Sequence, residues 1–179
     1  MAVRKLKTMT NDKTERYVEM LSQVETFCSG GDNAISVLAN CAAVMKVQFP
    51  DNYFWVGFYI VDGNELFWGP FQGTPACTRI KYGRGVCGTA WKEQRTLVVS
   101  DVNQFLDHIV CSSLSRSEIV VSILYGDTIV GEIDIGSTSL STFDSTDAAY
   151  LEKVACIIAP HTAILAKNRV VECLYGIRL

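Results

Sequence analysis

Apolar residues recur every three or four positions in the first quarter of the chain, which predicts two amphipathic helices. The first helix starts at Lys13 and has its apolar stripe at Tyr17, Met20, Leu21, Val24, Phe27 and Cys28. Gly30 and Gly31 are expected to end this helix, and Asp32 can then cap the next one. The second helix ends before Pro50 and has its apolar stripe at Ile35, Leu38, Ala39, Ala42, Met45 and Val47.

The pattern then changes to one that is typical of β-strands. Residues 53–61 are mainly aromatic and β-branched, a composition that strands favour. The turn residues Asp62-Gly63-Asn64 follow, and Glu65–Gly69 continues as the returning strand of a hairpin. The same criteria predict a short helix at Thr89–Glu93, a strand at Thr96–Ser100, and a second hairpin with strands at Glu118–Leu124 and Ile129–Ile135.

A last helix is expected from Asp144 onward, with Asp147 in its first turn and a kink at Pro160. Its apolar stripe consists of Tyr150, Leu151, Val154, Ile157, Ile158, Ile164 and Leu165. Because tight turns join antiparallel strands, the predicted fold class is α+β, a single domain with an antiparallel β-sheet flanked by helices. The irregular segments 70–95 and 100–117 remain to cover the other face of the sheet, and a pocket is expected beneath them.

Composition narrows the classes of function. The chain has 179 residues, of which 49% are hydrophobic, and this is enough for one domain with a full core. A net charge of −3 argues against a nucleic-acid partner, and the absence of a continuous apolar run of about 18 residues argues against a membrane span. Seven cysteines in no disulfide-framework pattern indicate the reducing cytoplasm. Without a C-x-x-C motif, and with only His108 and His161 as histidines, no metal is expected.

Three cysteines stand apart from the apolar stripes. Cys77 ends the glycine-containing run 69–77, Cys87 lies within the run 83–90, and Cys111 follows His108. Glycines allow close approach of the backbone to a ligand, and nearby cations favour the reactive thiolate form of cysteine. These three thiols therefore indicate redox chemistry, whereas the other helical cysteines are expected to pack in the core: Cys28, Cys41 and Cys156.

A series of motifs resembles the free methionine-(R)-sulfoxide reductases, enzymes built on a single GAF domain. The motifs span residues 15–165 and include Trp55-Val56-Gly57-Phe58-Tyr59, Gly69-Pro70-Phe71-Gln72-Gly73, Gly83-Arg84-Gly85-Val86-Cys87-Gly88, Ser117-Glu118-Ile119-Val120 and Gly131-x-Ile133-Asp134-Ile135. Residues 1–12 are polar and basic, which predicts a flexible segment. The resemblance implies a GAF-like catalytic domain at 13–168 and an extension of the last helix at 169–179.

The resemblance also implies an activity and its partners. The substrate would be free L-methionine (R)-sulfoxide, with Cys111 as the attacking thiolate, Cys77 as the principal resolving cysteine and Cys87 as a third or alternative one. Thioredoxin would restore the dithiol, no bound cofactor is needed, and a homodimer is possible.

Sulfoxide chemistry suggests roles for further residues. Glu118 can supply a proton to the departing oxygen if its pocket raises its pKa. Trp55 and Tyr59 can form an apolar wall for the methyl group, Asp134 suits the substrate ammonium, and backbone N–H groups of the glycine-rich turns suit its carboxylate.

The chain departs from the family pattern at two positions in its strands. Gly136 stands where the pattern Asp-Ile-Asp has a second aspartate, and Ser122 stands where a proline is usual. The glycine favours an alternative function, that of a GAF module which senses a small ligand without catalysis, whereas the three cysteines favour the enzyme.

Overall fold

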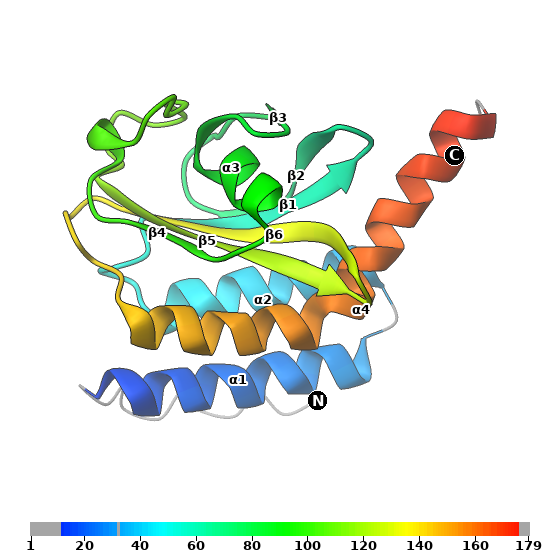
Figure 1. The fold of residues 1–179 in the computed structure, drawn as a ribbon. Coiled ribbons are helices and arrows are strands. Elements are labelled where there is room, and N and C mark those ends of the chain that lie inside the picture. The colour runs from blue at the N-terminus through cyan, green and yellow to red at the C-terminus, as the bar shows by residue number, and fades with distance from the viewer. Residues whose placement is uncertain (1–11, 32, 176–179) are drawn as a thin grey trace.

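The computed structural model describes residues 12–31 and 33–175, and it confirms the α+β class (Figure 1). The helices are α1 (Lys13–Gly30), α2 (Ala34–Gln48), α3 (Gly85–Glu93) and α4 (Ser145–Tyr175). The strands are β1 (Trp55–Asp62), β2 (Glu65–Gln72), β3 (Arg79–Lys81), β4 (Leu97–Val99), β5 (Ser117–Tyr125) and β6 (Thr128–Ser137). They form one six-stranded antiparallel sheet in the order β3-β2-β1-β6-β5-β4.

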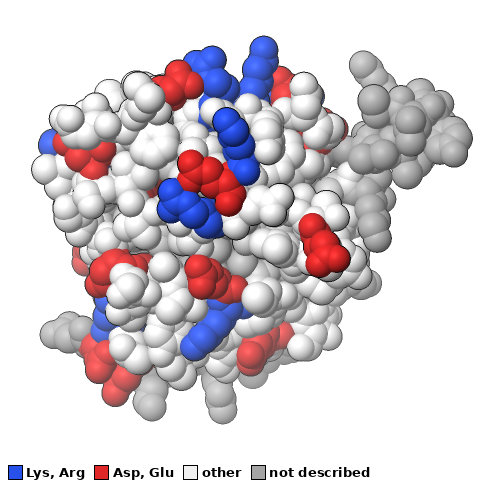
Figure 2. Space-filling view, viewed as in Figure 1, with Lys and Arg blue, Asp and Glu red and all other residues white. Residues whose placement is uncertain are grey.

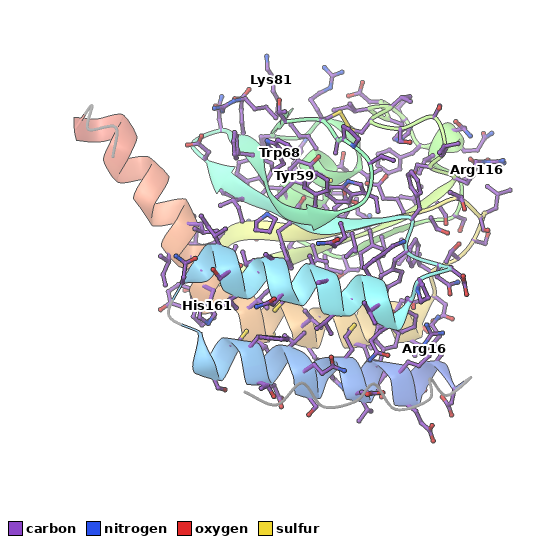
Figure 3. The ribbon with its side chains drawn as sticks, turned by 180° about the vertical axis from the view of Figure 1, so that it is seen from behind. Arg16, Tyr59, Trp68, Lys81, Arg116 and His161 are labelled. Atoms are coloured by element: carbon purple, nitrogen blue, oxygen red, sulfur yellow. A yellow bond between two sulfur atoms is a disulfide. The ribbon has the colours of Figure 1, made fainter. Side chains whose placement is uncertain are left out.

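The two faces of this sheet have different covers. Helices α1, α2 and α4 lie on one face, while α3 and the irregular segments lie on the other (Figure 1). Alternation along β1 sends Val56, Phe58 and Ile60 into the core beneath the three helices. Trp55 and Tyr59 belong to a second cluster on the α3 side. Figure 3 shows Tyr59 on that side of the sheet, away from the helices.

Polar side chains fix the helix starts. The side chain of Asp12 accepts hydrogen bonds from the backbone of α1, and the Asn33 side chain accepts one from Ser36 N at 3.0 Å to cap α2. The predicted cap of α2, Asp32, lies outside the described residues, and the structure gives the capping position to Asn33 instead. The last helix was expected to begin at Asp144. It begins one residue later, at Ser145, and the Asp144 side chain accepts a hydrogen bond from Thr146 N at 2.7 Å.

Helix α4 contributes its buried side to the core and contains Pro160, as expected. By length and composition, its part Ser145–Ala166 could cross a membrane, with 22 residues and a mean hydropathy of 1.3. A core helix of a soluble protein passes the same test. Leu151, Val154 and Ile158 of α4 are buried within the domain core.

On the face shown in Figure 2, acidic and basic side chains are interspersed rather than gathered by sign.

The irregular regions contain more structure than the sequence predicted. Strand β3 and a one-turn 3₁₀ helix, Val102–Gln104, were not expected, and α3 begins at Gly85 rather than Thr89. Strand β2 continues past Gly69 through Pro70, which is possible because β3 pairs only with residues 65–67 of β2. Of the predicted flexible segment 1–12, all but Asp12 lies outside the described residues. Helix α4 continues into the predicted extension as far as Tyr175.

Candidate active site

The candidate site lies on the α3 side of the sheet, where three central strands place their side chains in rows. The register of β1, β6 and β5 aligns Trp55–Gly136–Glu118, Gly57–Asp134–Val120 and Tyr59–Glu132–Ser122. Residues that face each other across antiparallel strands project to the same side. Glu118 and Asp134 are 16 positions apart on the two strands of the β5–β6 hairpin, and both are far from Trp55 in sequence. The register brings all three to one surface.

A pocket of about 610 Å³, a volume that includes its open mouth, lies over these rows. Six of the seven predicted site residues line it, namely Trp55, Tyr59, Cys87, Cys111, Glu118 and Asp134. The seventh, Cys77, is bonded to Cys111 at its edge. The structure therefore brings all seven together, and their chemical roles remain predictions.

Aromatic rings form one wall of the pocket. Trp55 packs between Tyr59 and Phe71, with ring centroids 6.1 and 5.3 Å away. Its indole Nε1 donates a hydrogen bond to the Thr74 carbonyl at 3.0 Å, which fixes the orientation of the ring. Gly57 makes this packing possible, because a Cβ at that position would lie 2.7 Å from the Trp55 ring.

A disulfide joins Cys77 to Cys111, with their Cα atoms 5.4 Å apart. This is the pair that the resemblance implied. Cys77 follows β2 and Cys111 precedes β5, so the bond ties two irregular segments together above the sheet. The Tyr59 hydroxyl donates to the Cys77 carbonyl at 2.8 Å. Tyr59 thus holds the backbone of the cysteine segment as well as lining the pocket.

The floor of the pocket holds a cluster of three acidic groups, of which Cys87 is buried and Glu118 and Asp134 are half-buried. The ligand atoms of Cys87, Glu118 and Asp134 all lie within 4.8 Å of one another. Burial, and then the proximity of Asp134, raises the pKa of Glu118 well above its ordinary range. Burial likewise raises the pKa of the Cys87 thiol, and it raises the pKa of Asp134 to about 7. These shifts favour the protonated form of Glu118, which is the form that can donate a proton.

These three side chains could also surround a metal ion, judged by distance alone. The expectation that no metal is needed stays a prediction.

Comparisons with known proteins fit this geometry. The family model for the GAF domain matches residues 37–159. The free methionine-R-sulfoxide reductase of Escherichia coli (strain K12) is 37% identical over 150 residues, which cover 80% of this chain and 90% of that protein. The GAF domain-containing protein A of Dictyostelium discoideum is 49% identical over 150 residues, covering 83% of this chain and 94% of that protein.

A solved structure gives the same result. The free methionine-R-sulfoxide reductase from Neisseria meningitidis, in complex with its substrate, superposes with a TM-score of 0.84 at 46% identity, covering 90% of this chain and 98% of that chain. The chain belongs to the free methionine-R-sulfoxide reductase family of GAF domains. Its membership accounts for the motif series across residues 15–165, because the motifs fall on the strands and segments that build the pocket.

Several residues that line the pocket were not among the predicted site residues. Arg84 and His108 line the pocket, together with Ser112 and Ser115. The Arg84 side chain donates to Asp107 at 2.8 Å, which ties the start of α3 to the segment that leads to Cys111. Arg84 immediately precedes the first turn of α3, whose N–H groups have no acceptors within the helix. In the sequence, the sign of this role was the position of Arg84 within the glycine-rich run 83–90.

The cysteines outside the pocket only partly match the prediction that they pack in the core. Cys41 is buried and Cys28 is half-buried, and both belong to the core region between the helices. Cys156 is exposed, so the prediction that it packs in the core is wrong. It lies on the outer side of α4, between the core residues Ala155 and Ile158. The predicted apolar stripe of α4 included a position that faces away from the core.

Proposed function

We propose that this chain reduces free L-methionine (R)-sulfoxide to L-methionine and is recycled by thioredoxin. The observation that carries the proposal is the Cys77–Cys111 disulfide beside a pocket lined by Glu118, a half-buried carboxyl whose pKa is raised. A sulfoxide reductase needs a thiol nucleophile, a second thiol and an acid, and this arrangement supplies the three. The reductases named among the relatives support the choice of substrate.

In the first step, the Cys111 thiolate attacks the substrate at the sulfoxide while Glu118 gives a proton to the oxygen. Methionine leaves, and Cys111 becomes a sulfenic acid that carries the oxygen and that proton. In the second step, the Cys77 thiol attacks the Cys111 sulfur. The disulfide forms and the oxygen departs as water, with its second proton taken from the Cys77 thiol. A thioredoxin dithiol then opens the disulfide by exchange and is itself oxidised.

Recognition of a free amino acid follows from the two ends of the pocket. The aromatic wall of Trp55 suits the methyl group, and Asp134 suits the ammonium. Arg84 and the first turn of α3 offer a cation and backbone N–H groups to the carboxylate. Because a peptide-linked residue lacks both charges, it should bind poorly.

Cys87 has a place in the same scheme as an alternative resolving thiol. Its sulfur is 3.9 Å from Glu118 Oε1 and lies on the pocket floor. Burial keeps this thiol protonated, so it is a weaker nucleophile than an exposed one. We expect it to act when Cys77 is absent.

The test is a coupled assay with thioredoxin, its reductase and NADPH. Free methionine (R)-sulfoxide should be consumed, while the (S) epimer and N-acetylmethionine sulfoxide should not. Cys111→Ser should produce no methionine, even in a single turnover. Equal turnover of the free and acetylated substrates would contradict the proposal, as would one equivalent of methionine from the serine variant.

A second candidate is a GAF module that binds a small ligand without turnover. Gly136 favours it, since a glycine leaves the position beside Glu118 without a carboxyl. Binding of the sulfoxide with no methionine formed at any reductant concentration would support this candidate over the enzyme.

A further inference from the structure

One hydroxyl group on the wall of the pocket has no part in the scheme above. Ser115 is half-buried and lines the pocket together with Glu118 and Gly136. Other serines of the same segment have partners: the Ser112 hydroxyl accepts from a backbone N–H at 3.3 Å, and the Ser117 hydroxyl donates to a backbone carbonyl at 2.6 Å. The Ser115 hydroxyl makes no hydrogen bond within the described part of the chain, so it is available to a ligand.

The Ser115 hydroxyl fills the space beside Gly136. A Cβ built on Gly136 would lie 3.2 Å from Ser115 Oγ, so the hydroxyl stands where a side chain at position 136 would go. Gly136 pairs with Glu118 on one side and with Trp55 on the other, and residues opposed in this way project to the same face of the sheet. The hydroxyl therefore lies between the wall that suits the substrate methyl group and the acid that serves the sulfoxide oxygen.

Backbone hydrogen bonds hold Ser115 in this place. Arg116, the next residue, donates its N–H to the Ser137 carbonyl at 2.7 Å, and its own carbonyl accepts from Val102 N at 2.9 Å. The segment is thus attached to the end of β6 on one side and to the 3₁₀ helix on the other. Because the backbone is fixed, the Ser115 hydroxyl needs only to rotate about its Cα–Cβ bond to reach a ligand.

We propose that Ser115 is a further catalytic residue, whose hydroxyl donates a hydrogen bond to the oxygen of the bound sulfoxide. This role rests on the proposed function. A sulfoxide oxygen carries a partial negative charge and can accept two hydrogen bonds, so Glu118 and Ser115 can contact it together. As Cys111 attacks, negative charge grows on the oxygen and the hydrogen bond from Ser115 becomes stronger. Glu118 transfers its proton whereas Ser115 keeps its own, so the proton balance of the scheme is unchanged.

The first test compares the full chain with Ser115→Ala and with Ser113→Ala, the matched control. Ser113 belongs to the same segment, but it is exposed and does not line the pocket. In the thioredoxin-coupled assay, Ser115→Ala should lower kcat about tenfold. This is less than the ~10²–10³-fold effect of removing an enclosed oxyanion donor, because Ser115 is only half-buried. KM should change less than about twofold, since the charge develops in the transition state. The control should keep both constants.

Two measurements separate this role from a structural one. Because the Ser115 hydroxyl makes no hydrogen bond within the described part of the chain, Ser115→Ala should melt at the wild-type temperature. Because a serine hydroxyl does not titrate in the pH range of the assay, kcat should fall by the same factor at every pH. If Ser115 acted instead by adjusting Glu118, the limb of the pH profile that reports the Glu118 pKa would move.

A double variant tests the place of the contact. Gly136→Asp brings a side chain into the space that the Ser115 hydroxyl occupies, so the hydroxyl turns away and the new carboxyl lies beside Glu118. Adding Ser115→Ala to this variant should therefore lower kcat less than about twofold, since residues in contact act non-additively while independent residues add.

Three outcomes would overturn the assignment. The first is a wild-type kcat in Ser115→Ala. The second is a shifted pH limb or a lowered melting temperature in that variant, since either would show that the hydroxyl acts through another group. The third is the same loss of kcat with and without the Gly136→Asp substitution. If the wild-type protein itself forms no methionine, the proposed function fails as well, and that result is distinct from an active wild type beside an unimpaired Ser115→Ala.

Discussion

Placing a carboxyl at position 136 should make the protein a faster reductase. Gly136 lies between Trp55 and Glu118 in the sheet and lines the pocket. A Cβ built there would lie 3.2 Å from the Ser115 hydroxyl oxygen and 4.0 Å from Trp55 Cβ. The first contact is tight, but it involves the end of a side chain that can rotate. Gly136→Asp should therefore fold normally and direct its carboxyl toward Glu118.

The size of the effect follows from the pairing of the strands. Directly opposed residues of antiparallel strands lie about 5 Å apart. Two carboxylates at that separation interact by about 3 kcal/mol at an effective dielectric constant of about 20, which equals roughly 2 pKa units. The new carboxyl would raise the pKa of Glu118 further and add a second acid near the oxygen. Since general acid catalysis contributes ~10²–10⁴-fold, we expect kcat to rise about tenfold, with little change in KM.

The assay compares the wild type, Gly136→Asp and Gly136→Asn in the thioredoxin-coupled reduction of free methionine (R)-sulfoxide from acid to alkaline pH. The asparagine variant is the control, because it has the same shape but no proton to give. Melting curves of all three show whether the new side chain strains the sheet. If the aspartate variant is no faster than the asparagine variant, a carboxyl at this position is not what limits the reaction, and the reasoning from strand pairing is refuted.

Two further predictions concern the thiols and the buried acids. Cys77→Ser should release one methionine per chain and then stop or slow. Mass spectrometry should then detect a Cys87–Cys111 disulfide or a sulfenic acid. Unchanged steady turnover would show that Cys77 does not resolve the intermediate. Burial raises the pKa of Asp134 from its ordinary 3.8 to about 7, so the folded state keeps a proton that the unfolded state releases. This contribution to stability is complete below about pH 4 and is lost as the pH rises to 7, with a slope of up to roughly 1.4 kcal/mol per pH unit. Urea unfolding should show a weaker loss of stability over this range in Asp134→Asn, and parallel curves for the two proteins would contradict the raised pKa.

The elements with regular periodicity could be predicted from the sequence, because local pattern and tertiary structure agree there. Helices α1, α2 and α4 and the hairpins β1–β2 and β5–β6 match their predicted ranges closely. The three-residue strand β3 could not be predicted, since three residues carry no period. It is defined by pairing with β2, which only the folded chain provides.

Site residues that belong to a family motif could be predicted from the sequence, whereas residues that come together only through the packing of the strands could not. Cys77, Cys111 and Glu118 came from the family motifs, and the structure places them together. Ser115 was missed because a serine in an irregular segment gives no sign of which strand it lies against. Its place beside Gly136 follows from the pairing of β5 and β6, which exists only once the sheet has formed.

Because the Cys77–Cys111 bond stabilises the folded chain, the melting temperature of the protein should depend on whether this bond is formed. The two cysteines are 34 positions apart, and the chain between them forms β3, α3 and β4, which are much of the cover over the pocket. A cross-link closing a loop of this length restricts the unfolded chain by roughly 4 kcal/mol in the loop-entropy view. In the oxidised form the segment that covers the pocket is a loop closed by the disulfide, and in the reduced form its two ends are no longer linked. In the proposed cycle, the oxidised form that remains after methionine is released would be more stable than the reduced form that binds the next substrate.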